Sequence, residues 1–437
     1  MSGGEPQRGP RWLTGAGNAI RRVPSAGPRA AVRREAPSLL HLLRPQGPPS
    51  GTGMVDARPH ERLEDGCAVL RVTRAAAVDG QDGYRFHGRC GDLACSSGAT
   101  ALMAPSIGLG NATEAGEFPS EILRCTKLWS GNQRELGGWI NQVRARYGDR
   151  LRLIVWDDTG LELPWEMFWV PADDRLGLTG GLLGAVLRLA RWMTVHDGRQ
   201  GLPEQTEECH GGILAYLHDD MVDDGLLFKP YVHQTHPRMT PFLRALDTVE
   251  ERTGLVYMGC HGTYGDAVTR LTLAGRTWAE YDSQTMHVLR THGSMVCLNA
   301  CHSGRFVHNR AQGEHALRGF AELFLRKGAG GCIVTAGRVG DLEARVLIRR
   351  LMREVTDHPE LPVTETLRAF RARAVKDFGT LAAIPTTRND EGHVDMVGQK
   401  RVLRLLYAFM FHYYGHPLTA LRLVSEKGNN VWGGGPW

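Results

Sequence analysis

Two short apolar runs that end in a histidine and a cysteine constrain this chain more than any other feature. Residues 253–262 read Thr-Gly-Leu-Val-Tyr-Met-Gly-Cys-His-Gly, and residues 293–304 read Gly-Ser-Met-Val-Cys-Leu-Asn-Ala-Cys-His-Ser-Gly. Apolar runs of about five residues flanked by glycine are typical of parallel strands that are buried on both faces. In open α/β sheets the chemistry lies just beyond the carboxyl ends of such strands. We therefore predict an α/β fold in which His261 and Cys301 meet at neighbouring strand ends.

A thiol beside an imidazole is a nucleophile beside its base. The thiolate is the reactive form of cysteine, and imidazole can take the thiol proton near neutral pH. We expect Cys301 to attack an acyl carbon and His261 to act as the base. This chemistry requires no metal and no cofactor, and none is predicted.

Other residues compete for both roles. Cys297 lies in the middle of an apolar run, so it should be buried. Cys260 adjoins His261, and neighbouring side chains on an extended chain point to opposite faces. His302 and His308 are alternative bases, but neither precedes a glycine after a strand.

Five sequence blocks resemble those of CHAT-domain proteases, which are caspase-like cysteine peptidases related to caspases and separase. The resemblance covers about residues 120–425 and rests on these blocks: Leu-Pro-Trp-Glu-Met at 163–167, the His-Gly and Ala-Cys-His-Ser-Gly blocks at 261–262 and 300–304, Gly-Ala-Gly-Gly-Cys-Ile-Val-Thr at 328–335, and Tyr-Tyr-Gly-His-Pro at 413–417. It implies a caspase-like α/β fold with a mainly parallel sheet flanked by helices on both faces. It also implies a cysteine endopeptidase.

The resemblance further implies how the site is built. The backbone N–H groups of Gly262 and Cys301 would form the oxyanion hole, which stabilises the charge that develops on the substrate carbonyl. Ser303 and Gly304 would form the sharp turn that exposes the thiol. Gly304 is expected to adopt a backbone geometry that other residues avoid.

Substrate preference is predicted from two places near the nucleophile. In caspase-like folds the residue two positions before the nucleophile, here Asn299, and the loop after the first strand, here 218–220, contribute to the first subsite. A carboxylate at Asp219 or Asp220 would favour a basic residue before the cleaved bond, because a buried pair with arginine discriminates strongly. A solvated turn is the alternative, and the uncharged Asn299 argues against charge selection.

Charge, hydropathy and cysteine content argue against a nucleic-acid-binding protein, a membrane protein and a disulfide-rich protein. The net charge is +5, but residues 1–53 contribute +6 through eight arginines and two glutamates, so the remainder is nearly neutral. A nucleic-acid partner is therefore not predicted. No apolar run approaches the ~18 residues that span a bilayer, so no membrane partner is predicted. Nine irregularly spaced cysteines do not resemble a disulfide framework, which favours a reducing, cytoplasmic setting.

The chain divides into four predicted segments. Residues 1–53 are rich in Arg, Gly and Pro and read as a disordered tail, with a transit peptide or a true start at Met54 as alternatives. Residues 54–120 are poorly defined and could be an adaptor or an extension of the core, and Cys90 and Cys95 there only weakly suggest a metal knuckle. Residues 121–425 form the CHAT-like domain, and residues 426–437 form a tail.

Apolar periodicity places the main elements of this domain. Strands are predicted at 67–73, 84–87, 151–156, 211–217, 255–258 and 332–336, with a hairpin at 271–277 and sheet at 403–414; helices are predicted at 136–147, 240–252, 316–327 and 364–378, with a further helix capped by Asp341.

The family resemblance also suggests a setting. Such proteases act in bacterial signalling or antiviral defence on a protein partner, for example a gasdermin-like pore former, and an activating partner is expected as well. Two alternatives stay open: a catalytically silent CHAT-like interaction scaffold, and another thiol acyl-transfer enzyme such as an amidase or a transpeptidase.

Overall fold

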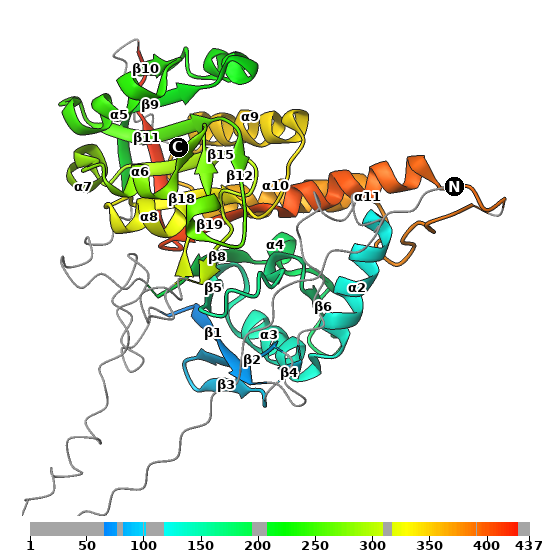
Figure 1. The fold of residues 1–437 in the computed structure, drawn as a ribbon. Coiled ribbons are helices and arrows are strands. Elements are labelled where there is room, and N and C mark those ends of the chain that lie inside the picture. Colours follow the sequence, from blue (N-terminus) through cyan, green and yellow to red (C-terminus); the bar gives the residue numbers. More distant parts are fainter. Residues whose placement is uncertain are drawn as a thin grey trace, which may run out of the picture. The chain divides into compact units, whose positions relative to one another are not determined.

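The computed structural model describes residues 65–76, 82–98, 100–101, 118–194, 208–308, 317–389 and 391–426 (Figure 1). All of them belong to one compact unit within residues 46–437. The predicted tail at 1–53, Met54 and nearly all of the predicted tail at 426–437 lie outside the described residues. In the described part of the chain, no helix combines the length and the apolar character that a bilayer span requires.

A 13-stranded sheet forms the framework. Its main path runs β10-β9-β11-β15-β18-β19-β8-β5-β1-β2-β3, while β20 pairs with β9 and β4 pairs with β2. The strands are β1 (Cys67–Ala76), β2 (Asp82–Cys90), β3 (Leu93–Ser96), β4 (Thr100–Ala101), β5 (Arg152–Asp157), β8 (Arg188–Trp192), β9 (Glu208–Leu217), β10 (His233–His236), β11 (Thr253–Gly259), β15 (Met295–Asn299), β18 (Gly331–Thr335), β19 (Phe411–Gly415) and β20 (Ala420–Leu423).

Most of the pairings in this sheet are parallel. The antiparallel ones are β18 with β19 and the pairings of β2 with β1, β3 and β4. Every residue of β11, β15 and β18 is buried. These central strands can be uninterrupted apolar runs because both of their faces are covered.

Helices cover the two faces of the central strands. On β11, the side chains of Leu255 and Tyr257 pack into one core cluster, which also contains Leu347. The side chain of Val256 points to the opposite face and packs into a second cluster with Phe242. The first face carries α9 (Asp341–Asp357), α10 (Val363–Phe378) and α11 (Met396–Phe409), and the second carries α5 (Met239–Thr248), α6 (Trp278–Asp282), α7 (His287–His292) and α8 (Phe320–Arg326). The predicted mainly parallel sheet with helices on both faces is confirmed.

The sheet continues into the N-terminal region. β1 pairs with β5 in parallel, so residues 67–101 extend the same sheet. A third core cluster forms there between these strands and α2 (Pro119–Gly131) and α3 (Arg134–Tyr147).

The Leu-Pro-Trp-Glu-Met block at 163–167 forms a turn that contains a buried 3-10 helix, Trp165–Met167. Trp165 and Glu166 are almost fully buried there. Glu166 accepts hydrogen bonds from both Nε and Nη2 of Arg191 on β8. The Nη2 group of Arg191 also donates to the Leu163 carbonyl oxygen at 3.0 Å. This charge pair fastens the turn to the middle of the sheet.

Short elements complete the structure. They are β6 (Trp169–Val170) with β7 (Gly181–Leu182), α4 (Leu183–Val186), β12 (Gly262–Thr263) with β13 (Thr272–Leu273) and β14 (Arg276–Thr277), β16 (Val307–His308) with β17 (Leu317–Arg318), and 3-10 helices at Gly148–Arg150, Asp219–Leu227 and Val268–Arg270.

Three predictions of elements are wrong in part. Residues 403–414 were expected to be sheet, but α11 occupies the segment up to Phe409 and only β19 follows. The helix predicted from 316 begins at Phe320, because Leu317–Arg318 pairs instead as β17. The cap residue of α9 is Gly340, and Asp341 is the first residue of the helix.

Candidate active site

The register of β11 and β15 brings His261 and Cys301 together. The two strands are parallel neighbours, and Gly259 is paired with Asn299. His261 and Cys301 each lie two residues beyond this pair. Adjacent strands lie about 4.8 Å apart, so the two residues leave the same edge of the sheet side by side.

The backbones of these two strand ends come very close at Gly262. A Cβ atom at this position would lie 2.2 Å from the Cys301 carbonyl oxygen, a distance that real side chains do not adopt. Only glycine fits there. The residue after His261 therefore has a packing reason to be glycine, and its contact is the candidate nucleophile itself.

Cys301 lies in a tight turn at the end of β15. Cys301 is partly exposed, and its Sγ lies 3.8 Å from the Val339 carbonyl oxygen. His302 has a φ of 60°, a left-handed conformation that residues other than glycine seldom adopt. Gly304 was expected to be the residue with special geometry, but its role is steric, because a Cβ there would lie 2.6 Å from Cγ2 of Val334.

The turn after Cys301 is anchored to the segment that precedes the 163–167 turn. Arg305 donates to both carboxylate oxygens of Glu162, at 2.6 and 2.8 Å. The guanidinium group of Arg305 also lies over the Tyr264 ring, 3.5 Å from its centroid. A bidentate pair with a stacked ring fixes the arginine in one position and so orders the turn.

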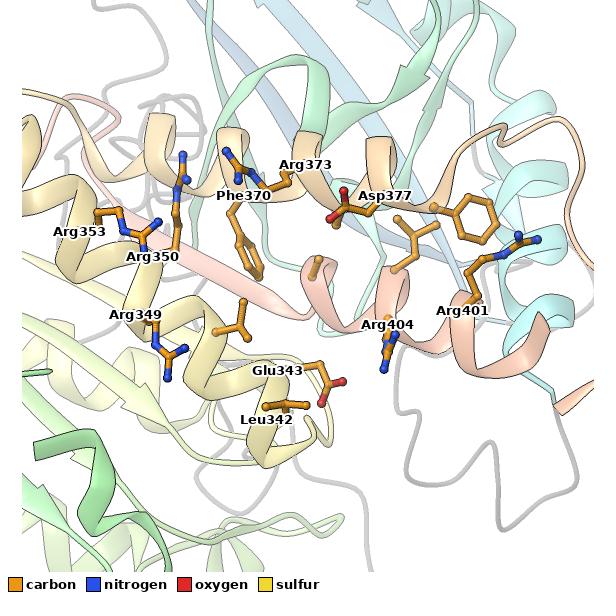
Figure 2. Close-up of a pocket in the computed structure, with 15 residues that line it drawn as sticks. Leu342, Glu343, Arg349, Arg350, Arg353, Phe370, Arg373, Asp377, Arg401 and Arg404 are labelled. Atoms are coloured by element: carbon orange, nitrogen blue, oxygen red, sulfur yellow. The ribbon is translucent and has the colours of Figure 1, made fainter. Parts of the chain in front are cut away.

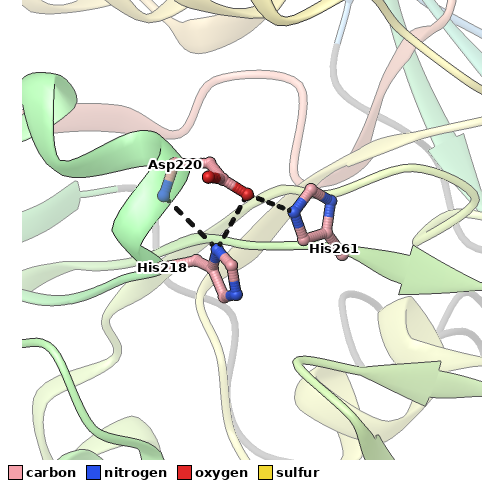
Figure 3. Close-up of side chains that lie close together, drawn as sticks. All are labelled: His218, Asp220 and His261. Atoms are coloured by element: carbon pink, nitrogen blue, oxygen red, sulfur yellow. Dashed lines mark hydrogen bonds and ion pairs between the residues drawn. The ribbon is translucent and has the colours of Figure 1, made fainter.

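His261 is paired with a carboxylate from the loop after β9. Its Nε2 atom lies 3.0 Å from Oδ2 of Asp220 (Figure 3). This hydrogen bond lowers the pKa of the Asp220 carboxyl group. Nδ1 of His218 lies 3.4 Å from the same oxygen, and the ring centroids of the two histidines are 4.7 Å apart. Asp220 thus holds the His261 imidazole in one orientation.

No hydrogen bond joins Cys301 to His261 in the described structure. Sγ of Cys301 contacts Val339, and Nε2 of His261 contacts Asp220. In enzymes without substrate the catalytic hydrogen bonds are often long or misaligned and shorten when substrate binds.

Two backbone N–H groups beside the thiol are free to donate. Among the described residues, none accepts a hydrogen bond from the N–H of Cys301. The N–H of Ala274 donates to the His261 carbonyl oxygen, so Gly262 and Leu273 form a non-hydrogen-bonded pair of the β12–β13 ladder. The Gly262 N–H group therefore has no partner in that ladder.

Comparison with known proteins identifies the segment that contains both strand ends. Residues 235–381 match the family model of the CHAT domain. This segment is similar to the CHAT domain, in agreement with the family resemblance found in the sequence. No curated protein sequence matches the chain.

Three solved structures are similar to parts of this chain. The complex of the pro- and mature domains of RgpB from Porphyromonas gingivalis is 13% identical, with a TM-score of 0.40, covering 67% of this chain and 70% of the other. The Arg-specific cysteine proteinase gingipain R is 12% identical, with a TM-score of 0.38 and coverages of 67% and 69%. The separase–securin complex of Saccharomyces cerevisiae is 12% identical, with a TM-score of 0.32 and coverages of 61% and 16%.

The competing cysteines of the CHAT domain are shielded. Cys260 is fully buried, and this burial raises the pKa of its thiol to about 12. Burial also raises the pKa of the Cys297 thiol. A buried protonated thiol is a poor nucleophile. Cys301 differs from both in that its side chain reaches solvent.

The competing histidines are also occupied or held neutral. Burial, followed by repulsion from Arg305 and Arg338, lowers the pKa of His302 to about 4. Nε2 of His308 lies 3.1 Å from the Thr159 carbonyl oxygen, on the other side of the turn.

Asn299 belongs to a buried polar network that the sequence did not indicate. It is 5% exposed, and its amide donates to the Tyr257 hydroxyl at 2.8 Å and to Asp224 at 3.3 Å. The Tyr257 hydroxyl donates to the same Asp224 carboxylate at 2.6 Å. Asp224 was missed because nothing in the acidic run 219–224 distinguishes it before the fold is known. Asp219, by contrast, is exposed.

His218, Asp220 and His261 are also residue types that bind metals. One ligand atom from each lies within 4.8 Å of the others. Two of the three side chains are more than half exposed. In the described arrangement the Asp220 carboxylate orients His261, and this contact is the one that bears on acyl-transfer chemistry.

Proposed function

We propose that the CHAT domain is a cysteine endopeptidase in which Cys301 is the nucleophile and His261 the base. The observation that carries this proposal is the contact between the two strand ends. Gly262 touches the Cys301 backbone, the thiol is partly exposed, and His261 is oriented by Asp220. A nucleophile, a base and a group that orients the base are the parts that covalent catalysis requires.

The reaction would proceed through a thioester. Because Asp220 holds Nε2 of His261, Nδ1 is the ring nitrogen left to take the proton from Sγ of Cys301. The thiolate attacks the peptide carbonyl carbon, and the resulting tetrahedral oxyanion accepts hydrogen bonds from the N–H groups of Gly262 and Cys301. His261 then gives its proton to the leaving amine as the C–N bond breaks. Water, with His261 as base, hydrolyses the thioester and releases the acid.

Substrate contact would begin with a small movement of the thiol. In the described state Sγ of Cys301 faces the Val339 carbonyl oxygen. Rotation about the Cα–Cβ bond moves Sγ from this carbonyl group towards His261, at the small cost of a change between staggered rotamers. Peptide binding along the strand edge would favour the rotated state.

Asp219 and Asn299 remain proposed substrate contacts. Asp219 is exposed and directly precedes Asp220 in the chain, so its carboxylate could attract a basic residue before the cleaved bond. Asp220 pairs with His261, which leaves it less available for the same task. Asn299 is buried and hydrogen-bonded to Tyr257 and Asp224, so it would shape the base of the first subsite.

We also propose that the substrate is a protein in a reducing, cytoplasmic setting. All nine cysteines are free thiols, which fits a reducing compartment. The gasdermin-like substrate, the activating partner and the role in bacterial defence follow from the family resemblance alone.

Cleavage of a diverse peptide library, read by mass spectrometry, tests the proposal. We expect internal cleavage by the native chain and none above background by Cys301→Ala. Cys125→Ala is the matched control because Cys125 is an exposed free thiol outside the site. Cleavage that persists in Cys301→Ala contradicts the nucleophile assignment. Release of ammonia without internal cleavage indicates an amidase, joined peptide fragments indicate a transpeptidase, and absence of any product indicates a silent scaffold.

A further inference from the structure

A cavity of about 490 Å³ lies among α9, α10 and α11 (Figure 2). It does not include the turn at residues 301–304, which we call the catalytic turn. Six of its 15 lining residues are arginines, and two are acidic, Glu343 and Asp377. The arginines come from all three helices. This volume is within the range of small-molecule sites, roughly 300–1,000 Å³.

Four of the six arginines contact neither an acidic side chain nor an aromatic ring among the described residues. Arg350 pairs with Glu354, and Arg401 lies over the Phe378 ring, 5.3 Å from its centroid. The four that remain are exposed, and they are Arg349, Arg353, Arg373 and Arg404. Like charges gathered at one cavity repel one another, and a bound anion relieves that repulsion.

The floor of the cavity is apolar. Phe370, Leu405 and Ala408 line it between the charged side chains. At its edge Leu342 is 65% exposed and Val346 is 46% exposed, although both lie on an otherwise well-packed helix. A ligand that suits this surface has a flat, weakly polar part for the floor and several negative charges for the rim.

We propose that this cavity binds a nucleoside polyphosphate. Guanidinium groups match phosphate oxygens with two parallel hydrogen bonds, and four unpaired guanidinium groups can serve a triphosphate. The base would lie against Phe370 and the apolar floor, where an arginine already stacks on the neighbouring Phe378. The size of the cavity favours a small ligand over an extended acidic peptide.

Helix α9 connects this cavity to the catalytic turn. It begins directly after Gly340, and the carbonyl group of Val339 contacts Sγ of Cys301. Its Arg345 pairs with Asp223 and Asp224 on the 3-10 helix Asp219–Leu227, which also carries Asp220. A ligand that moves α9 would thus act on Cys301 and on Asp220 together. This regulatory consequence rests on the proposed peptidase function, whereas the binding site does not.

Isothermal titration of the full chain with ATP tests the binding site. We expect saturable binding, weaker binding of inorganic tripolyphosphate, and no binding of a hexaglutamate peptide. Arg349→Ala with Arg404→Ala should weaken ATP binding by at least about tenfold, since hydrogen bonds to charged groups contribute about 1.5–3 kcal/mol each. Arg244→Ala on α5 is the control, because this arginine is exposed and distant in the fold.

Three outcomes overturn the binding proposal. They are no ATP binding at millimolar concentration, equal ATP affinity in the double variant whose unfolding midpoint is unchanged, and preference for the acidic peptide. The regulatory consequence has its own readout, the rate of peptide cleavage with and without ATP. We expect that rate to change in the native chain and not in the double variant. ATP binding in a chain that cleaves no peptide contradicts the peptidase proposal alone, and unchanged cleavage in the presence of bound ATP contradicts the regulatory consequence alone.

Discussion

Two histidine–carboxylate contacts in this chain have similar distances and opposite surroundings. Nε2 of His261 lies 3.0 Å from Asp220, and these side chains are 58% and 65% exposed. Nε2 of His412 lies 3.2 Å from Glu166, and these side chains are 4% and 1% exposed. The comparison shows that burial, more than the pair itself, decides what such a contact can do.

The buried pair is fixed in one protonation state. Burial opposes the charge of Glu166, but attraction from Arg191 and His412 outweighs it and lowers the pKa of the carboxyl group to about 2. Burial, with repulsion from Arg191, lowers the pKa of His412 to about 3. Glu166 therefore stays ionised and His412 neutral near pH 7, which suits a structural anchor. Asp220 and His261, by contrast, are both more than half exposed.

Removal of the buried charge should have the largest effect on stability. Glu166→Gln leaves the guanidinium group of Arg191 buried without its counterion, so we expect the free energy of unfolding to fall by about 3–5 kcal/mol. Urea denaturation followed by tryptophan fluorescence measures it. Asp220→Asn is the matched exposed variant, and its stability should change by less than about 0.5 kcal/mol. Equal losses in both variants would remove the distinction between the two pairs.

Acid should destabilise the chain through the same buried pair. Glu166 has a folded pKa of about 2 against an ordinary value of 4.5, so its stabilising contribution is complete above pH 4.5 and is lost as the pH falls towards 2. His412 has a folded pKa of about 3 against 6.5, so the unfolded chain binds the extra proton between pH 6.5 and 3. Both shifts lower stability on acidification, together by about 3 kcal/mol or more.

Urea midpoints measured between pH 7 and pH 3 check this dependence. In Glu166→Gln the decline between pH 4.5 and pH 3 should become shallower, because the Glu166 contribution is gone and the His412 contribution remains. A native chain whose stability is constant over this range would show that these two groups do not titrate as described.

The exposed pair, Asp220 and His261, should affect the rate of peptide cleavage and not the stability of the fold. In Asp220→Asn the imidazole of His261 loses its charged orienting partner, and we expect the rate of peptide cleavage to fall by about 10- to 100-fold at unchanged stability. Asp174→Asn is the matched control, since Asp174 is an exposed carboxylate between β6 and β7 and is not among the proposed site residues, and Asp219→Asn tests the proposed substrate contact. A changed preference for the residue before the cut in Asp219→Asn would support its proposed substrate role. Full activity in Asp220→Asn would show that His261 needs no orientation.

The positions of His261 and Cys301 at the ends of two strands could be predicted from the residues next to them in the sequence. The apolar runs before His261 and Cys301 gave β11 and β15, and parallel pairing then placed the two residues at one edge. Residues 403–414 misled because the helix α11 is itself apolar on one side, and its end runs directly into β19.

Contacts between distant segments could not be predicted in the same way. The roles of Asp220 and Asp224 depend on how the 3-10 helix Asp219–Leu227 packs beside β11 and β15. The arginine cavity needs three helices to meet, and each helix alone presents an ordinary charged face. In physical terms, local periodicity sets the elements, whereas side-chain partners depend on tertiary packing.

The alkylation rate of Cys301 tests the central claim most directly. Mass spectrometry after treatment with iodoacetamide at pH 7 measures it, with exposed Cys125 in the same chain as the internal reference. We predict that Cys301 reacts at least about tenfold faster than Cys125, and that this advantage is lost in His261→Ala, because the thiolate is the reactive species. Equal rates at the two cysteines, or an advantage that survives in His261→Ala, would contradict the catalytic pair.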